Sequence, residues 1–289
     1  MVKNVLLTGT GGFVGSALQL HFQGKYNILA PRSSQLNLTD FEEVRKYFSQ
    51  NEIDFVVHCA NKGGARGVLD DRSVVEDNLK MFHNLKNCLG KKRMITFGSG
   101  AQYEKARPLK KVSEKSLGEL IPQDPYGYSK YLQAQEVLKT DNVLCLNIFG
   151  SYGKGEKNNR FPSDAITKNI QSEPIVINQN VVFDYLYIED LCKIVEYFVE
   201  NKPKERIINI TPTQSISLLE IAQIVNEISD FESEIVIKNS ELNNEYTGDN
   251  SILLKEIEGF EFTSYKEGLK VLFEYLKGVK SFTASQTKI

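Results

Sequence analysis

The N-terminal segment combines a short apolar run, a cluster of glycines and a helical pattern. Val5 to Leu7 predict a strand that is buried on both faces of a parallel sheet. After the glycines, apolar residues recur at helical spacing, at Phe13, Val14, Ala17, Leu18 and Phe22. Where a glycine turn joins a strand to a helix, the backbone N–H groups at the start of the helix point outward from its positive end. A pyrophosphate binds to such groups. The segment therefore predicts a nucleotide-binding site.

Three of these glycines have distinct expected roles. Gly9 permits a tight turn, Gly12 lets phosphates approach the backbone, and Gly15 lets the helix pack closely on the sheet. A glycine turn alone is often only a loop. Because this one lies between a strand and a helix at the start of the chain, nucleotide binding is favoured.

Strand and helix patterns alternate through the first half of the chain. Expected strands cover residues 26–30, 54–59, 93–97 and 143–149, and expected helices cover 41–48, 73–88 and 128–138. This alternation predicts an α/β fold of the Rossmann type, a doubly wound parallel sheet with helices on both faces. The second half is mixed and predicts a smaller α/β substrate domain, with a hairpin at 175–183. We assign 1–150 and 184–201 to the first domain, 151–183 and 202–280 to the second, and 281–289 to a flexible tail.

Composition and the N-terminal sequence indicate which partners, metal sites and cellular location to expect. The 289 residues are 41% hydrophobic, and their net charge of −2 gives no reason to expect nucleic acid or an anionic membrane as a partner. The four cysteines form no Cys-x-x-Cys pair and no cluster with histidine, so neither a metal site nor a disulfide is predicted. The N-terminus does not resemble a signal peptide, and no apolar run approaches the ~20 residues of a membrane span. We expect a cytoplasmic protein.

Three side chains suggest chemistry. Tyr126 and Lys130 lie four residues apart, on one face of an expected helix. A nearby ammonium favours the phenolate and can lower the pKa of a phenol from ~10 by roughly one to three pH units. Ser99 follows the strand at 93–97, at the same sheet edge as the glycine turn, where its hydroxyl can bind a carbonyl oxygen. Tyr126 and Lys130 also fit a surface helix, and Ser99 also fits a turn. Only the three residues together therefore indicate a catalytic site.

Together these patterns resemble the extended short-chain dehydrogenase/reductase family of NAD(P)-dependent sugar-nucleotide epimerases, dehydratases and reductases. The segment 32–64 most resembles the GDP-fucose synthase-like reductase branch of this family. The resemblance rests on the glycine motif, on 54–61, on Ser99 four residues before Tyr103, on 125–130 and on 183–190. It implies that Tyr126 is the proton donor or acceptor, that Lys130 holds the nicotinamide ribose, and that Ser99 orients the substrate carbonyl.

The end of the second strand bears on the choice of cofactor. An NAD enzyme usually has an acid there, about 20 residues after the glycine motif, to bind the ribose hydroxyls. This chain has Arg32 and no acid, and a guanidinium can pair with a 2′-phosphate. We therefore expect NADP, with NAD as the alternative. The resemblance adds Asp40 at the adenine amine, although Asp40 also fits the N-cap of the helix at 41–48. Other cofactor contacts expected by resemblance are Phe13, Val14, Cys59, Ala60, Asn61 and Asn78.

The residues that follow Ser99 distinguish reactions within the family. The resemblance places an Asp-Glu pair there in 4,6-dehydratases, and a cysteine two positions after the serine in GDP-fucose synthases. This chain has Gly100 and Ala101 instead. We therefore expect NADPH-dependent reduction of a 4-keto group on a nucleotide-linked 6-deoxy sugar, with Tyr126 as proton donor. Two alternatives stay open, an NAD-dependent sugar-nucleotide 4-epimerase and a non-catalytic NADP-binding regulatory protein.

The substrate positions depart from the family pattern. Asn147 replaces an arginine in the strand at 143–149, and Phe183 replaces an arginine that binds the sugar nucleotide. Arg160 can supply positive charge to a diphosphate instead. The expected substrate-binding residues are Ser99, Gly100, Ala101, Asn147, Arg160 and Phe183. The resemblance also implies a homodimer that pairs the helices at 73–88 and 128–138.

Overall fold

A parallel sheet forms the centre of the computed structural model, which describes residues 2–65 and 67–286, with side chains up to residue 279. Its six strands lie in the order β11-β6-β4-β3-β1-β2. They are β1 (Asn4–Thr8), β2 (Asn27–Leu29), β3 (Phe55–His58), β4 (Arg93–Ser99), β6 (Val143–Ile148) and β11 (Ile207–Asn209). All pairings within this sheet are parallel, which confirms the expected Rossmann-type fold.

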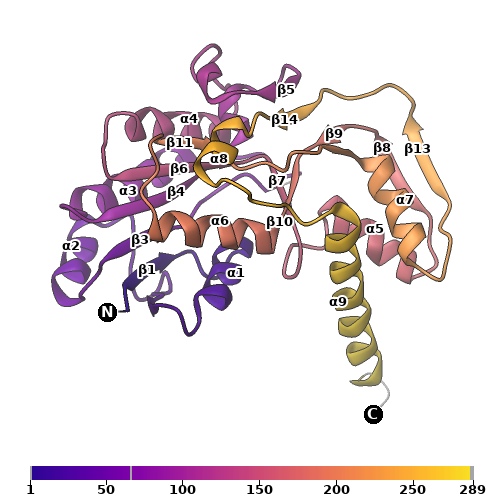
Figure 1. The fold of residues 1–289 in the computed structure, drawn as a ribbon, viewed down its shortest axis with the longest axis horizontal. Helices are drawn as coiled ribbons and strands as arrows, with labels where there is room; N and C mark the ends of the chain where they lie inside the picture. The colour runs from indigo at the N-terminus through magenta and orange to yellow at the C-terminus, as the bar shows by residue number, and fades with distance from the viewer. Residues whose placement is uncertain (1, 66, 287–289) are drawn as a thin grey trace.

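Helices cover both faces of the sheet (Figure 1). One face carries α1 (Phe13–Phe22) and α6 (Ile188–Glu200), and the other carries α2 (Phe41–Gln50), α3 (Ser73–Cys88) and α4 (Pro125–Val137). Successive residues of a strand point to opposite faces, so β1 contributes Val5 and Leu7 to one core and Leu6 to the other. All three side chains are fully buried. The uninterrupted apolar run of β1 is therefore the consequence of a helix layer on each side.

The order of the strands reverses at β1, because β2 lies on one side of it and β3 on the other. In doubly wound sheets, ligands bind beyond the carboxyl ends of the strands at such a switch point. The glycine turn follows β1, residues 59–61 follow β3, and Ser99 ends β4. The fold therefore brings these three segments to one edge.

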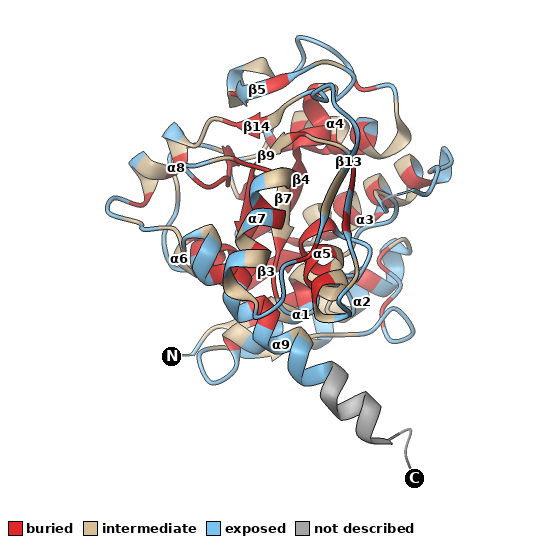
Figure 2. Cartoon of the chain, turned by 90° about the vertical axis from the view of Figure 1, so that its right-hand side faces the viewer, coloured by how far each residue is buried: buried red, intermediate tan, exposed pale blue. Residues whose placement is uncertain are grey.

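The described residues outside the central sheet form three smaller sheets and further helices. One sheet has the order β12 (Ile216–Ser217), β9 (Val182–Phe183), β14 (Tyr246–Gly248) and β5 (Leu109–Val112). Two strand pairs join β7 (Gly150–Tyr152) to β10 (Tyr185–Tyr187) and β8 (Ile175–Gln179) to β13 (Ile235–Asn239). The helices are α5 (Phe161–Ile170), α7 (Leu218–Ile228), α8 (Ser251–Glu256) and α9 (Tyr265–Gln286). Helix α9 projects from the body of the protein, and much of its surface is exposed (Figures 1 and 2).

The structure differs from the sequence analysis in its second half. The hairpin expected at 175–183 is wrong, because β8 pairs in parallel with β13 while β9 pairs with β12 and β14. Two short apolar runs around a polar centre resemble a hairpin, but here each run pairs with a distant segment. Strand β11 lies within 202–280 yet forms an edge of the central sheet, and β5 lies within 1–150 yet pairs with β14. Of the expected tail 281–289, α9 includes the part up to Gln286, and 287–289 lie outside the described residues.

The four cysteines, Cys59, Cys88, Cys145 and Cys192, are free thiols. Two of them, Cys145 and Cys192, are buried, and the other two are partly exposed. Within residues 2–65 and 67–286, no helix combines the length and the hydrophobicity needed to cross a bilayer.

Candidate active site

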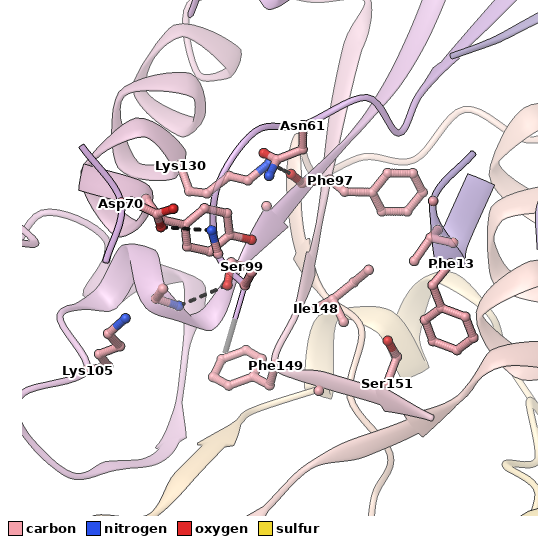
Figure 3. Close-up of a pocket in the computed structure, with 18 of the residues that line it drawn as sticks. Phe13, Asn61, Asp70, Phe97, Ser99, Lys105, Lys130, Ile148, Phe149 and Ser151 are labelled. Atoms are coloured by element: carbon pink, nitrogen blue, oxygen red, sulfur yellow. Dashed lines mark hydrogen bonds between the residues drawn. The ribbon is translucent and has the colours of Figure 1, made fainter. Parts of the chain in front are cut away.

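Two neighbouring cavities lie at the carboxyl edge of the central sheet. The first, of about 830 Å³, is lined by the glycine turn on one side and by Ser99, Tyr126 and Lys130 on the other. Figure 3 shows Lys130 and Ser99 across this cavity from Phe13. The second, of about 840 Å³, includes Arg32. Both are lined by Gly9, Gly12, Cys59, Ala60 and Asn61. One groove therefore runs across the glycine turn.

The glycine turn leaves no room for side chains. Gly9 has φ +72°, and a Cβ added to it would lie 2.4 Å from the backbone nitrogen of Ala60. A Cβ on Gly15 would lie 2.2 Å from the carbonyl oxygen of Gly9. No side chain among the described residues caps α1 at Gly12, so the first N–H groups of this helix are left for an anion in the groove. This cradle fits a pyrophosphate.

Buried polar groups hold the segment that follows β3. The Oγ1 of Thr8 lies 2.8 Å from Nδ1 of His58 and accepts a hydrogen bond from the Ala60 N–H at 3.3 Å. Burial lowers the pKa of His58 to about 3, so this imidazole stays neutral near pH 7. The side-chain amide of buried Asn78 binds both the N–H and the carbonyl oxygen of Lys62, at 2.8 and 3.0 Å. His58 and Asn78 thus hold the backbone that lines the groove.

Helix α4 positions the phenol and the ammonium. Asp124 caps the helix by accepting the Gly127 N–H at 2.9 Å, and this cap starts the helix at Pro125, ahead of the expected 128. Tyr126 consequently lies in the first turn. Lys130, one turn later, is buried, and its Nζ donates a hydrogen bond to the Phe97 carbonyl oxygen at 2.8 Å. This ammonium nitrogen is 5.8 Å from the centre of the Tyr126 ring.

The titration of this pair differs from the sequence-based expectation. Burial raises the pKa of Tyr126, and a hydrogen bond with Ser99 and the charge of Arg160 offset only part of that effect. Burial also lowers the pKa of Lys130, to about 8. The expected lowering of the Tyr126 pKa by Lys130 is therefore wrong for this structure, because desolvation outweighs charge. The phenol is therefore protonated near pH 7.

The loop that leads from β3 into α3 packs on the phenol. A Cβ on Gly64 would lie 2.8 Å from the Tyr126 ring, so only a glycine allows this approach. The Gly64 N–H donates to Asp70 at 2.8 Å, a bond drawn in Figure 3. Both residues line the first cavity, and neither is marked by a motif in the sequence.

Ser99 ends β4 and starts the short 3₁₀ helix η1 (Gly100–Tyr103). Its hydroxyl oxygen accepts a hydrogen bond from the Ala101 N–H at 3.2 Å. A Cβ on Gly100 would lie 2.6 Å from both the Phe149 ring and the Tyr246 hydroxyl. The missing side chain of Gly100 therefore leaves the space that Phe149 and Tyr246 occupy.

Beside Ser99, the cavity wall is aromatic. Phe149, Phe183 and Tyr246 come from three separate segments and all line the first cavity. The ring centre of Tyr246 lies 5.2 Å from that of Phe149 and 5.6 Å from that of Phe183. Sequence analysis misses Tyr246 because it follows a polar segment, and only the pairing of β14 with β5 and β9 brings its hydroxyl beside Gly100.

A buried carboxylate fixes the backbone of this aromatic wall. Asp184 directly follows Phe183 and is completely buried. It accepts hydrogen bonds from the Ser215 hydroxyl at 2.6 Å, the Gly248 N–H at 2.8 Å and the Lys111 ammonium at 3.3 Å. One side chain thus joins β9, β14, β5 and the segment before β12.

The structure brings most of the expected site residues to the groove. Those that line it are Gly9, Gly12, Phe13, Val14, Gly15, Arg32, Cys59, Ala60, Asn61, Ser99, Ala101, Tyr126, Lys130, Arg160 and Phe183. Among the described residues, four expected ones lie outside both cavities: Asp40, Asn78, Gly100 and Asn147. Asp40 is the N-cap of α2 and accepts the Glu43 N–H at 3.0 Å.

Asn147 is the largest departure from the expected substrate contacts. It is completely buried in β6, and its amide donates to the Tyr103 hydroxyl and to Asn209, both at 3.0 Å. These partners lie within the protein, between the central sheet and η1. The family position at 147 therefore serves packing in this chain and is sealed from the cavity.

The fold and the site together define a dinucleotide-binding Rossmann protein with a Ser, Tyr and Lys constellation. Residues 5–211 match the NAD dependent epimerase/dehydratase family, and the chain belongs to this family. GDP-L-colitose synthase of Yersinia pseudotuberculosis is 23% identical over 262 residues, which are 82% of this chain and 85% of the relative. These similarities confirm the expected family and branch.

Two solved structures show the same fold. A GDP-mannoheptose C4 reductase from Campylobacter jejuni with NADP bound matches with a TM-score of 0.80 at 20% identity, over 96% of this chain and 98% of that one. A UDP-glucose 4-epimerase from Thermotoga maritima matches with a TM-score of 0.81 at 20% identity, over 96% and 99%. The fold alone therefore does not separate reductases from epimerases.

Proposed function

We propose that this protein reduces a 4-keto group on a nucleotide-linked sugar with NADPH. The observation that carries the proposal is the convergence of Ser99, Tyr126 and Lys130 on a cavity that continues across the glycine turn. Relatives named as a GDP-L-colitose synthase and a GDP-mannoheptose C4 reductase support this class of substrate. When bound, the cofactor supplies a hydride to the carbonyl carbon.

The groove has a suitable group for each part of the dinucleotide. The N–H groups at the start of α1 bind the pyrophosphate, and Lys130 reaches the nicotinamide ribose. Arg32 lies in the second cavity, is exposed, and makes no ion pair with any described residue. Its guanidinium can bind a 2′-phosphate through charge-assisted hydrogen bonds. The NADP bound to the Campylobacter reductase supports the same choice of cofactor.

Ser99, Tyr126 and Lys130 bind the carbonyl oxygen and supply its proton. The Ser99 hydroxyl donates a hydrogen bond to the carbonyl oxygen. As the carbonyl carbon gains hydride, Tyr126 transfers its phenolic proton to that oxygen and becomes a phenolate. The Lys130 ammonium stabilises this phenolate, and a proton from water restores the phenol. Because burial raises the pKa of Tyr126, the phenol is protonated before the reaction and has a proton to transfer.

A 4-epimerase is the second candidate, favoured by the similarity to the Thermotoga structure. Such an enzyme oxidises and re-reduces one carbon with a retained cofactor. Arg32 favours NADPH, which a reductase consumes, whereas an epimerase must retain its cofactor. We also propose the homodimer through α3 and α4, which analytical ultracentrifugation would test.

The test is a panel of GDP-, UDP- and dTDP-linked 4-keto sugars, with NADPH and NADH at equal concentration. We expect net oxidation of NADPH, followed by its absorbance, with at least one ketone. Tyr126→Phe should lower kcat by about 10³-fold, with unchanged affinity for NADPH, because it removes the proton donor. Tyr128→Phe, on the exposed side of the same helix, is the matched control. Interconversion of 4-epimers without net oxidation would identify the epimerase, and binding without turnover the regulatory protein.

A further inference from the structure

We propose that Asp70 is a positioning residue that holds the Tyr126 phenol in place through the backbone of Gly64. Asp70 and Gly64 belong to the loop between β3 and α3, and Tyr126 lies in the first turn of α4. All three line the first cavity. The effect of this contact on turnover rests on the proposed function, whereas the contact itself belongs to the fold.

Gly64 packs directly on the phenol ring. It has φ +73°, and a Cβ added to it would lie 2.8 Å from both Cε2 and Cζ of Tyr126. Cζ is the ring carbon that carries the hydroxyl group. The backbone at residue 64 therefore limits how far the reacting end of the phenol can move on this side.

The Asp70 carboxylate determines where this backbone lies. Its Oδ2 accepts a hydrogen bond from the Gly64 N–H at 2.8 Å (Figure 3). Its Oδ1 lies 2.8 Å from the point that a Cβ on Gly63 would occupy, and Gly63 has φ +78°. A turn of two successive glycines is flexible by itself, because glycine adopts many backbone conformations. The carboxylate lies against both glycines and holds the turn in one conformation.

The residues before this turn are held by other groups. Asn78 binds the N–H and the carbonyl oxygen of Lys62, and the Asn61 amide donates to the carbonyl oxygens of Lys62 and Gly63 at 2.8 and 3.4 Å. The Gly64 N–H, in contrast, is bound by Asp70. Loss of the carboxylate should therefore loosen the turn at Gly64 and leave the preceding backbone in place.

The hydrogen bond matters more here than the charge. Burial is the main cause of the raised pKa of Tyr126, and the negative charge of Asp70 adds only a minor rise. An asparagine at position 70 removes the charge but keeps an oxygen that accepts the Gly64 N–H. Because misplacement of a reacting group by about 1 Å can cost about 100-fold in rate, loss of the hydrogen bond should affect kcat.

Steady-state kinetics with the ketone that the wild-type enzyme reduces test this role. We expect Asp70→Ala to lower kcat about 10-fold, because the phenol is less well placed, while KM and the NADPH affinity change less than about threefold. Asp70→Asn should keep kcat within about threefold of wild type. Amide hydrogen exchange at Gly64, followed by NMR, should be about 10-fold faster in Asp70→Ala and hardly changed in Asp70→Asn.

Asp71→Ala is the matched control. Asp71 lies in the same loop and carries the same charge, and its carboxylate accepts the Ser73 N–H at 2.7 Å. It is exposed and does not line the first cavity. We expect this variant to keep the wild-type kcat and the wild-type exchange at Gly64.

Gly64→Ala perturbs the same contact from the side of the loop. Its Cβ cannot fit 2.8 Å from the ring, so the loop or the phenol must move. We expect kcat to fall at least 10-fold, with a smaller change in NADPH affinity. If Asp70→Ala does not fold, this variant decides: a fall in kcat supports the proposal, and wild-type kcat overturns it.

The remaining outcomes separate this inference from the proposed function. Wild-type kcat or unchanged Gly64 exchange in Asp70→Ala would overturn the positioning role. A rise in KM alone would overturn it in favour of substrate binding, and an Asp70→Asn variant as slow as Asp70→Ala would do so in favour of a role of the charge. If the wild-type protein reduces no ketone, the proposed function fails, and crystal structures of wild type and Asp70→Ala decide instead. A displaced Tyr126 ring in the variant supports the inference, and an unchanged ring refutes it.

Discussion

The two sides of the groove are built in opposite ways. On the proposed cofactor side, Gly9 to Gly15 belong to one strand-turn-helix unit, and the groups that we propose to bind the pyrophosphate are backbone N–H groups without side chains in their way. On the substrate side, Phe149, Phe183 and Tyr246 reach the cavity from three distant segments. A cofactor common to many enzymes can be bound by local backbone. Selectivity for one substrate depends on side chains that only the complete fold brings together.

The largest effect that we expect on the binding of a ligand lies on the cofactor side. Gly9→Ala forces an alanine into φ +72° with its Cβ 2.4 Å from the Ala60 nitrogen, so the cradle must open. We expect the Kd for NADPH to rise about 100-fold, measured by fluorescence titration, which corresponds to ~2.7 kcal/mol. Gly11→Ala is the matched control, because nothing lies within 4 Å of its Cβ. Equal affinities in the two variants would contradict the backbone cradle.

A smaller effect is expected where the cofactor side uses a side chain. Arg32→Ala removes the charge-assisted hydrogen bonds to a 2′-phosphate. The ratio of kcat/KM for NADPH to that for NADH should fall about 30-fold. The value for NADH itself serves as the internal control and should hardly change. A ratio unaffected by the substitution would refute the role of Arg32.

On the substrate side, Phe183→Ala should act on the sugar nucleotide alone. Removal of the ring leaves a cavity and loses apolar contact, so we expect KM for the ketone to rise about 10-fold. The NADPH affinity should stay within about twofold, since the cofactor side is a separate local unit. Phe231→Ala, at an exposed phenylalanine outside the cavity, is the control. A parallel loss of NADPH affinity would show that the two sides are coupled.

The last effect, about twofold at pH 8, requires no substitution and concerns Lys130, which lies between the two sides. Because burial lowers its pKa to about 8, the ammonium is fully present well below pH 8 and is lost above it. We expect kcat to be constant from pH 6 to 7, to fall by about half at pH 8 and by about tenfold at pH 9. A pH–rate profile measures this fall in kcat above pH 7. Constant activity up to pH 10 would show that the charge of Lys130 is not required.

Local features of this site are predictable from the sequence, and long-range ones are not. The glycine turn and the spacing of Tyr126 and Lys130 are visible because each lies within one element. The raised pKa of Tyr126 is not, since spacing reveals a neighbouring charge but not the degree of burial. The hairpin at 175–183 fails for a related reason, because the apolar pattern of β8 does not identify β13 as its partner.

Tyr246 and Asn147 show, in opposite ways, that the sequence does not reveal which side chains reach the cavity. Tyr246 has no motif, yet β-sheet pairing brings it to the cavity. Asn147 occupies a family position, yet Tyr103 and Asn209 close it off from the cavity. Which face of a strand remains open depends on what packs there, and that packing comes from other parts of the chain.

The carboxylate of Asp184 bears on how such a protein can change during evolution. Since this buried group holds the strands behind the cavity through hydrogen bonds that do not involve the side chain of Phe183, we expect mutations at 183 to leave the framework intact. New sugar specificities could then arise by single substitutions, without a costly intermediate that has lost its cofactor site.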